Sequence, residues 1–337
     1  MTPQMRLFSV ITLTPVVLIG GAAVWGGFWV LAAAVYLTVL AGILDRLVHK
    51  ITPATEFPAG DGLSVTLAFA HFALLPTVVF ALAANELHAL EKLGLFFAAG
   101  LFFGQVSNAN AHELIHSSTR GRHRLGMWIY ISLLFGHHTS AHVLIHHKAV
   151  ATPADPNTSR WGENFYRFAV RAWTGSFQLG YQAEAARLKT SGRSAWRNPY
   201  VIYIAGALVA MGIALSISPK ALVFYVLLAG HAQMQLLMSD YVQHYGLMRA
   251  TAPSGKSVPV GPAHSWNSPH WFSSALMLNA TRHSDHHAHP ARPYPALTLP
   301  PDVPTLPKPL PMMAAIALVP PIWRQIMDPA VKRWRNV

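Results

Sequence analysis

The chain has 337 residues, of which 52% are apolar and 11% are charged, and it contains no cysteine. Because an average soluble domain carries about 25% charged residues, these figures exclude a disordered chain and an ordinary soluble globule, and they indicate a protein embedded in a membrane. Without cysteine there are no disulfides, thiolate nucleophiles or cysteine-ligated metal centres within this polypeptide, so any metal must be held by nitrogen or oxygen ligands.

Six apolar segments are long enough to cross a bilayer, since about 20 residues in a helix span about 30 Å. The first apolar tract is too long for one helix and is divided at Gly26-Gly27, which predicts two helices joined by a tight turn. The sequence therefore predicts an all-α integral membrane protein, with residues 1–337 forming a single domain. The predicted spans are about 7–25, 27–44, 63–83, 93–112, 198–217 and 220–240.

The cations predict the orientation, because lysine and arginine are retained on the cytoplasmic side of a membrane. With both termini in the cytoplasm, 23 of the 25 cations lie on that side. The polar regions 119–197 and 246–337 then form a cytoplasmic cap. We expect a multi-pass protein of a bacterial-type inner membrane, whose basic face meets lipid headgroups or an acidic electron carrier. No motif indicates nucleic-acid binding.

Histidines gather in three motifs near the predicted cytoplasmic ends of the helices. The first motif, His112-Glu113-Leu114-Ile115-His116, places two imidazoles on one helical face. The second motif lies at 136–147 and the third at 282–287, and His244 ends the last predicted helix. Together they offer more imidazoles than the three or four ligands of one zinc, so the pattern predicts two metal ions. Imidazole alone does not distinguish zinc, copper, iron and nickel.

Polar side chains near these histidines could accept the free ring N–H of a ligand and so fix its tautomer. They could equally be helix caps or solvated polar residues. The candidates are Asn108, Asp240 and Asn279, each one helical turn before a histidine, together with Glu113, Asp155 and Asp285.

The combination of motifs resembles the integral-membrane alkane hydroxylases of the membrane fatty-acid-desaturase-like group. The resemblance runs from about residue 100 to the C-terminus and includes the three histidine motifs and the segments 151–156, 159–166, 244–247 and 264–267. It implies six transmembrane helices with a cytoplasmic di-iron cap, and hydroxylation of a terminal alkane methyl to a primary alcohol with O₂ and electrons from a separate rubredoxin-type donor. The implied iron ligands are His112, His116, His142, His146, His147, His244, His283, His286 and His287.

Several positions depart from the family pattern without replacing a ligand, and they leave the reactivity and the substrate open. These positions are Ser117, Ala141, Ile145, Gln243 and Ala280-Thr281. An alkane has no polar group, so we expect an apolar channel between helices that opens to the bilayer. Phe102 and Phe103 are candidates for its lining, although the sequence favours ordinary helix packing for either of them.

Three other functions fit part of the pattern. A membrane desaturase or hydroxylase acting on fatty-acyl or other lipid substrates would use the same motifs. An intramembrane zinc metalloprotease would need one zinc and Glu113 as its general base. A metal transporter would need histidines along the transmembrane path, and three of the predicted spans contain none.

Overall fold

The computed structural model describes residues 3–47 and 60–335, so the last two residues of the predicted cytoplasmic region 246–337 lie outside it. Within these residues the chain is helical, with two isolated β-bridges and no strand. The prediction of six membrane-spanning helices is confirmed by six apolar helical stretches that are long enough to cross a bilayer. They are α1 (Pro3–Trp25); α2 (Gly27–Val35) with the π-helical η1 (Tyr36–Leu40) and α3 (Ala41–Leu47); α4 (Asp61–Ala83); α5 (Ala89–Phe102) with the π-helical η2 (Phe103–Ser107) and α6 (Asn108–Ile115); α11 (Pro199–Ile217); and α12 (Pro219–His244).

Two tight turns connect consecutive spans. Gly26 and Gly27, between α1 and α2, have φ angles of 62° and 52°, a left-handed conformation that glycine adopts without steric cost. The Gly27 N–H donates to Glu91 Oε1 at 2.6 Å, which ties this turn to the start of α5. Ser218 caps α12, its hydroxyl accepting from the Ala221 N–H at 3.0 Å. The turn at Gly26 and Gly27 confirms the predicted division of the first apolar tract.

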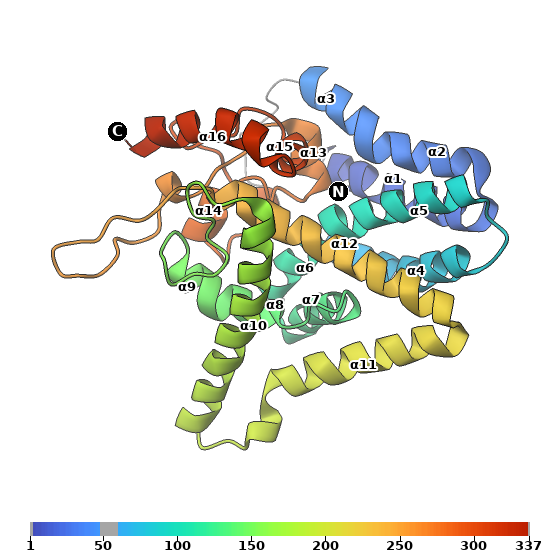
Figure 1. Cartoon of the computed structure of the whole chain (residues 1–337), viewed down its shortest axis with the longest axis horizontal. Helices are drawn as coiled ribbons and strands as arrows, with labels where there is room; N and C mark the ends of the chain where they lie inside the picture. The colour runs from blue at the N-terminus through green and yellow to red at the C-terminus, as the bar shows by residue number, and fades with distance from the viewer. Residues whose placement is uncertain (1–2, 48–59, 336–337) are drawn as a thin grey trace.

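The long helix α12 crosses the molecule and contacts helices from the membrane-spanning and the polar regions (Figure 1). It packs against α4 and α5 along its length, against α11 at its start, and against the C-terminal helix α15 (Leu310–Ala317) near its end. The continuous helix α5–η2–α6 lies beside it and ends in the same region. Two ligand-bearing helix ends are thereby brought together.

The polar regions fold into several short helices and the long helix α10 (Phe165–Thr190) (Figure 1). The residues after α6 form α7 (Arg120–Ser132), which packs against α4, α6 and α11, and the later residues bring their histidines back to α6 and α12. The remaining elements are α8 (His138–Ala141), the π-helical η3 (His142–His146), α9 (His147–Ala149), η4 (Ala195–Arg197), η5 (Pro262–His264), α13 (Trp271–Leu276), α14 (His283–Ala288), η6 (Tyr294–Ala296) and α16 (Pro320–Arg335).

The apolar helices keep much of their surface uncovered. Only 17% of the most apolar part of α11 is buried within the protein, and 22% of that of the second span. Phe28 is 74% exposed and Leu208 59% exposed. Such surface is stable only against lipid, so the packing supports membrane embedding independently of hydropathy.

Candidate metal centre

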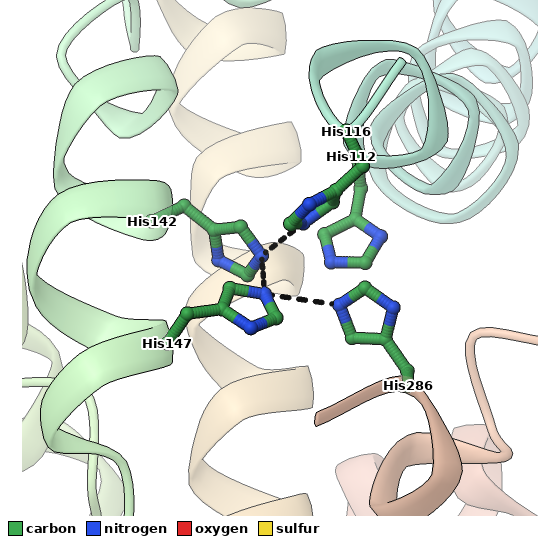
Figure 2. Close-up of side chains that lie close together, drawn as sticks. All are labelled: His112, His116, His142, His147 and His286. Atoms are coloured by element: carbon green, nitrogen blue, oxygen red, sulfur yellow. Dashed lines mark hydrogen bonds between the residues drawn. The ribbon is translucent and has the colours of Figure 1, made fainter. Parts of the chain in front are cut away.

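Nine histidine side chains converge where α6, α12 and the polar segments meet. They are the nine predicted as metal ligands, and they fall into two groups in which one nitrogen per ring lies within 4.8 Å of the others. The five-histidine group, shown in Figure 2, draws on α6, on the segment α8–η3–α9 and on α14. It contains His112, His116, His142, His147 and His286, and the four-histidine group contains His146, His244, His283 and His287.

The ring nitrogens point at one another in a way that suits bound cations. His142 Nε2 lies 3.1 Å from His116 Nε2 and 2.9 Å from His147 Nε2. One nitrogen can share a proton with one neighbour but not with two, so neutral rings leave lone pairs facing each other. The Nε2 atoms of His112 and His146 are buried without any partner. Buried, converging nitrogen donors of this kind fit two metal ions of the imidazole-binding class, which includes iron.

A π-helical turn divides the second motif between the two groups. In an α-helix, His142 and His146 at i and i+4 would share a face. The segment is η3 instead, and the wider i→i+5 turn puts His147 rather than His146 beside His142. His146 turns to the other group, where its ring lies 4.9 Å from that of His244 between centroids. Two histidines adjacent in sequence thus belong to different groups.

The third motif is also divided, and neighbouring polar residues fix the helix that carries it. His283 and His287, one turn apart on α14, join the four-histidine group, whereas His286 joins the other. Asn267 Oδ1 accepts from both the backbone N–H and the hydroxyl of Ser284, each at 3.0 Å. Asn267 is part of the segment 264–267 that the family resemblance includes, but the sequence did not indicate this contact.

Asp155 is the candidate acceptor that meets a clustered histidine directly. Its Oδ2 accepts from His146 Nδ1 at 2.8 Å, and both side chains are buried. This hydrogen bond places the proton on Nδ1 and leaves Nε2 free toward the metal position. Asp155 is held in turn by the Thr158 hydroxyl at 2.6 Å and the Asn157 N–H at 3.0 Å.

The other five candidates take different partners among the described residues. Asn108 donates to the carbonyls of Gly104 and Ala232, Asn279 donates to that of Tyr294, and Asp240 accepts from Asn157. Glu113 accepts from the Tyr294 N–H, and Asp285 accepts from His289, Arg292 and the Thr298 N–H. These contacts secure the helices around the histidines rather than the rings themselves.

Burial keeps most of the clustered rings neutral. It lowers the pKa of His116 to about 4 and that of His283 to about 3, and it holds the pKa of His142 well below its usual value. Burial also lowers the pKa of His146, but the charge and hydrogen bond of Asp155 outweigh it, so that pKa is raised. Since a metal binds the unprotonated nitrogen, rings of low pKa are available as ligands at neutral pH.

A cavity of about 110 Å³ adjoins both groups of histidines. His112, His142 and His283 line one end, and η2, α6, α12 and α15 contribute to its sides. Phe102 and Phe103 do not line it, because both side chains are fully buried in helix packing, the role that the sequence favoured for them. Two of the positions that depart from the family pattern, Gln243 and Ala280, do belong to its wall.

The comparisons with known proteins agree with this geometry. The family model described as fatty acid desaturase matches residues 91–299, which contain all nine histidines. An alkane 1-monooxygenase of Pseudomonas putida is 32% identical over 330 residues, covering 93% of this chain and 80% of the relative. The chain belongs to the alkane 1-monooxygenase branch of the fatty acid desaturase family.

Other members of the family show how far the likeness extends. An alkane 1-monooxygenase of Ectopseudomonas oleovorans is 34% identical, covering 92% of this chain and 77% of the relative. The xylene/toluene monooxygenase hydroxylase component of Pseudomonas putida is 27% identical, covering 92% of this chain and 85% of the relative. Monooxygenases named for different hydrocarbons thus share this fold family, so the substrate must be inferred from the cavity of each member.

Proposed function

We propose that the chain is a di-iron monooxygenase that hydroxylates the terminal methyl of a hydrocarbon chain to a primary alcohol. One oxygen atom of O₂ enters the C–H bond and the other leaves as water, with two electrons and two protons supplied. A single observation carries the proposal: two groups of buried and half-buried histidines lie at the end of a cavity whose walls come largely from apolar helices. Membership of the alkane 1-monooxygenases supports the same reaction.

The proposed irons would be held by the nine histidines, five in one group and four in the other. Bound iron supplies the activation of O₂ and the cleavage of the C–H bond. The chain itself contributes neutral ligands of fixed orientation. Asp155 holds the His146 ring, and Asn267 holds the start of α14.

The chain would also position the substrate and exclude water. Leu236, Met277 and Leu310 give the cavity an apolar wall on which a hydrocarbon can lie. Because His112 and His142 line the same cavity, a methyl group at this end would lie next to the five-histidine group. The apolar wall and its position beside the histidines would raise the rate by orienting the reacting carbon, rather than by acid–base chemistry.

The electron source in this proposal is a separate rubredoxin-type protein, because the chain has no cysteine with which to bind an iron–sulfur or rubredoxin centre. The proposed location is a bacterial-type inner membrane, with the histidine groups and both termini cytoplasmic. The distribution of 23 of the 25 cations supports this orientation. Protease accessibility of a C-terminal tag in inverted membrane vesicles tests it.

The reaction is tested on the purified protein loaded with iron in detergent. We expect two irons per chain, and formation of 1-octanol from octane that depends on O₂ and on an added rubredoxin and its reductase. Iron well below two per folded chain would contradict the proposed centre. An alkene formed from a fatty-acyl chain, with no alcohol from octane, would favour the desaturase alternative instead.

A further inference from the structure

Three buried aromatic side chains pack together beside the four-histidine group. Tyr245 directly follows His244 in the chain. Between ring centroids, Tyr245 lies 5.2 Å from Trp323 and 5.5 Å from Tyr241, and Tyr241 lies 5.2 Å from Trp323. All three side chains are fully buried. We call these three residues the aromatic cluster, and it connects a predicted metal ligand to α16.

The aromatic cluster reaches the protein surface at Trp161. The N–H of Gly162, the next residue in the chain, donates to the Tyr245 hydroxyl at 3.0 Å. The Trp161 side chain itself is 44% exposed. Two cations lie over its ring, the Arg335 guanidinium at 5.1 Å from the ring centroid and the Lys332 ammonium at 5.9 Å. Small anionic molecules in solution are attracted to such a basic patch.

The hydroxyl of Tyr245 has a partner that distinguishes it from the other tyrosines. It donates to Asp328 Oδ1 at 2.8 Å. Among the contacts that the structure describes, it is the only one of the ten tyrosine hydroxyls that donates to a carboxylate. Most of the others donate to backbone carbonyls, as Tyr241 does to that of Glu163 at 2.7 Å. A carbonyl does not take up a proton, whereas a carboxylate does.

This hydrogen bond prepares Tyr245 for reversible oxidation. A phenol that loses an electron becomes a strong acid, so it is oxidised readily only where a base accepts its proton. Asp328 is such a base, and it is half-buried rather than enclosed. Tyrosine and tryptophan give up electrons only to strong oxidants and do not accept them from mild reductants. The aromatic cluster is therefore suited to carry oxidising equivalents out of the protein and not to carry electrons in from a rubredoxin-type donor.

A strong oxidant arises in the proposed reaction whenever O₂ is activated. A bound hydrocarbon consumes it, but in an empty cavity only the protein is available for oxidation. Met238 and Met277 line the cavity, and methionine is readily converted to its sulfoxide. A route that removes the oxidant would protect these side chains and the histidines.

We propose that the aromatic cluster carries oxidising equivalents from the four-histidine group to Trp161 when O₂ is activated without a bound hydrocarbon. Tyr245 gives one electron to the oxidised centre and its phenol proton to Asp328. The Tyr245 radical then regains an electron, through Trp323 and Trp161, from a reductant in solution such as ascorbate, and the proton returns from Asp328. Two such transfers, with the two electrons of the separate donor and four protons from solvent, reduce O₂ to two waters. This inference rests on the proposed function and adds a protective reaction to it.

The route is tested first without any iron chemistry, in the full chain loaded with zinc, which has no redox reaction of its own. Because the chain has no cysteine, Lys332→Cys gives one attachment point for a ruthenium photo-oxidant beside Trp161. After a flash with an oxidative quencher, we expect the transient absorption of a tyrosyl radical. Tyr245→Phe should lose this signal. A tyrosyl signal of undiminished size in Tyr245→Phe, or none in the labelled parent, would overturn the proposal.

Two further variants separate this role from packing. Asp328→Asn keeps an oxygen that accepts from the Tyr245 hydroxyl but cannot take up the proton, so the yield of tyrosyl radical should fall although the contact remains. An unchanged yield would contradict the proton transfer to Asp328. Tyr225→Phe is the matched control, because Tyr225 lies on α12 and its hydroxyl donates to the Ser132 carbonyl at 2.7 Å. This variant should keep the full signal.

The protective role is tested in the iron-loaded protein, reduced and exposed repeatedly to O₂ with ascorbate and without octane. Mass spectrometry then measures the sulfoxide at Met238 and Met277. We expect more sulfoxide in Tyr245→Phe and Trp323→Phe than in the wild type or Tyr225→Phe, and octane should reduce the difference. Equal oxidation in all four proteins would overturn the protective role even if octane is hydroxylated as proposed. The zinc experiment decides the route even if octane is never oxidised, so the failure of one proposal is distinct from that of the other.

Discussion

The contact between Asp155 and His146 allows a sharp prediction about metal binding. Asp155 Oδ2 accepts from His146 Nδ1 at 2.8 Å and from the Thr158 hydroxyl at 2.6 Å, while Oδ1 accepts from the Asn157 N–H at 3.0 Å. All three neighbours are donors. The variant Asp155→Asn cannot satisfy them, because one oxygen is replaced by an NH₂ group.

Both orientations of the new amide are unfavourable. With the NH₂ toward Asn157, two donors face each other; with the NH₂ toward His146, the ring must place its proton on Nε2 and lose the lone pair meant for the metal. Loss of such an orienting contact typically weakens metal binding by about 10- to 100-fold, or about 1.4–2.7 kcal/mol. Since His146 belongs to the four-histidine group, the loss should fall on that metal.

The assay is a chelator titration of the iron-loaded protein, followed by iron content per chain and Mössbauer spectroscopy. We expect Asp155→Asn to release one iron at a chelator concentration about 10- to 100-fold lower than the wild type requires. Glu184→Gln is the matched control, because Glu184 is a buried carboxylate that accepts from the Ser140 hydroxyl instead of a histidine. Release of both irons at the wild-type chelator concentration from a folded variant would refute the reasoning.

Three further predictions follow from the site. His146→Ala and His147→Ala should perturb different irons, since the two rings belong to different groups; identical Mössbauer changes in both variants would contradict this assignment. Ala314→Phe, in the cavity wall on α15, should lower kcat/KM for hexadecane about tenfold or more with unchanged iron content, and unchanged kinetics would show that substrate does not occupy this cavity. The metal-free protein should lose thermal stability as pH falls from about 6.5 towards 4, because the lowered pKa values of His116 and His283 make the unfolded chain bind more protons there. The raised pKa of His146 offsets part of this loss, and a thermal midpoint that stays constant over this range would contradict the prediction.

The membrane fold could be predicted because its signals are local. The length and apolarity of each segment define a span, and the Gly26-Gly27 turn shows in the sequence itself. Helix α7 was not predicted, because Arg120, Arg122 and Arg124 make its first turns polar and only its later residues are buried against α4, α6 and α11. A helix that is half basic and half apolar carries no clear signal of either a loop or a span.

The candidate site could be predicted in composition but not in arrangement. Spacing identified the histidines as a set, yet i, i+4 periodicity would pair His142 with His146, and the π-helical turn pairs it with His147. Nothing in the sequence marks a π-turn. Gln105 of η2 donates to Gln235 of α12 from 130 positions away in the sequence, and this contact depends on how the two helices pack.

The division of the histidines into five and four would make the two proposed metal positions chemically unequal. A position with more nitrogen donors holds its ion more firmly, so protein made under limiting iron should carry single ions in one position rather than pairs in half of the molecules. Such a sample would fold normally but could not carry out a reaction that needs both ions. Specific activity should therefore rise steeply only once iron exceeds about one per chain, and total iron would be a poor measure of the active fraction.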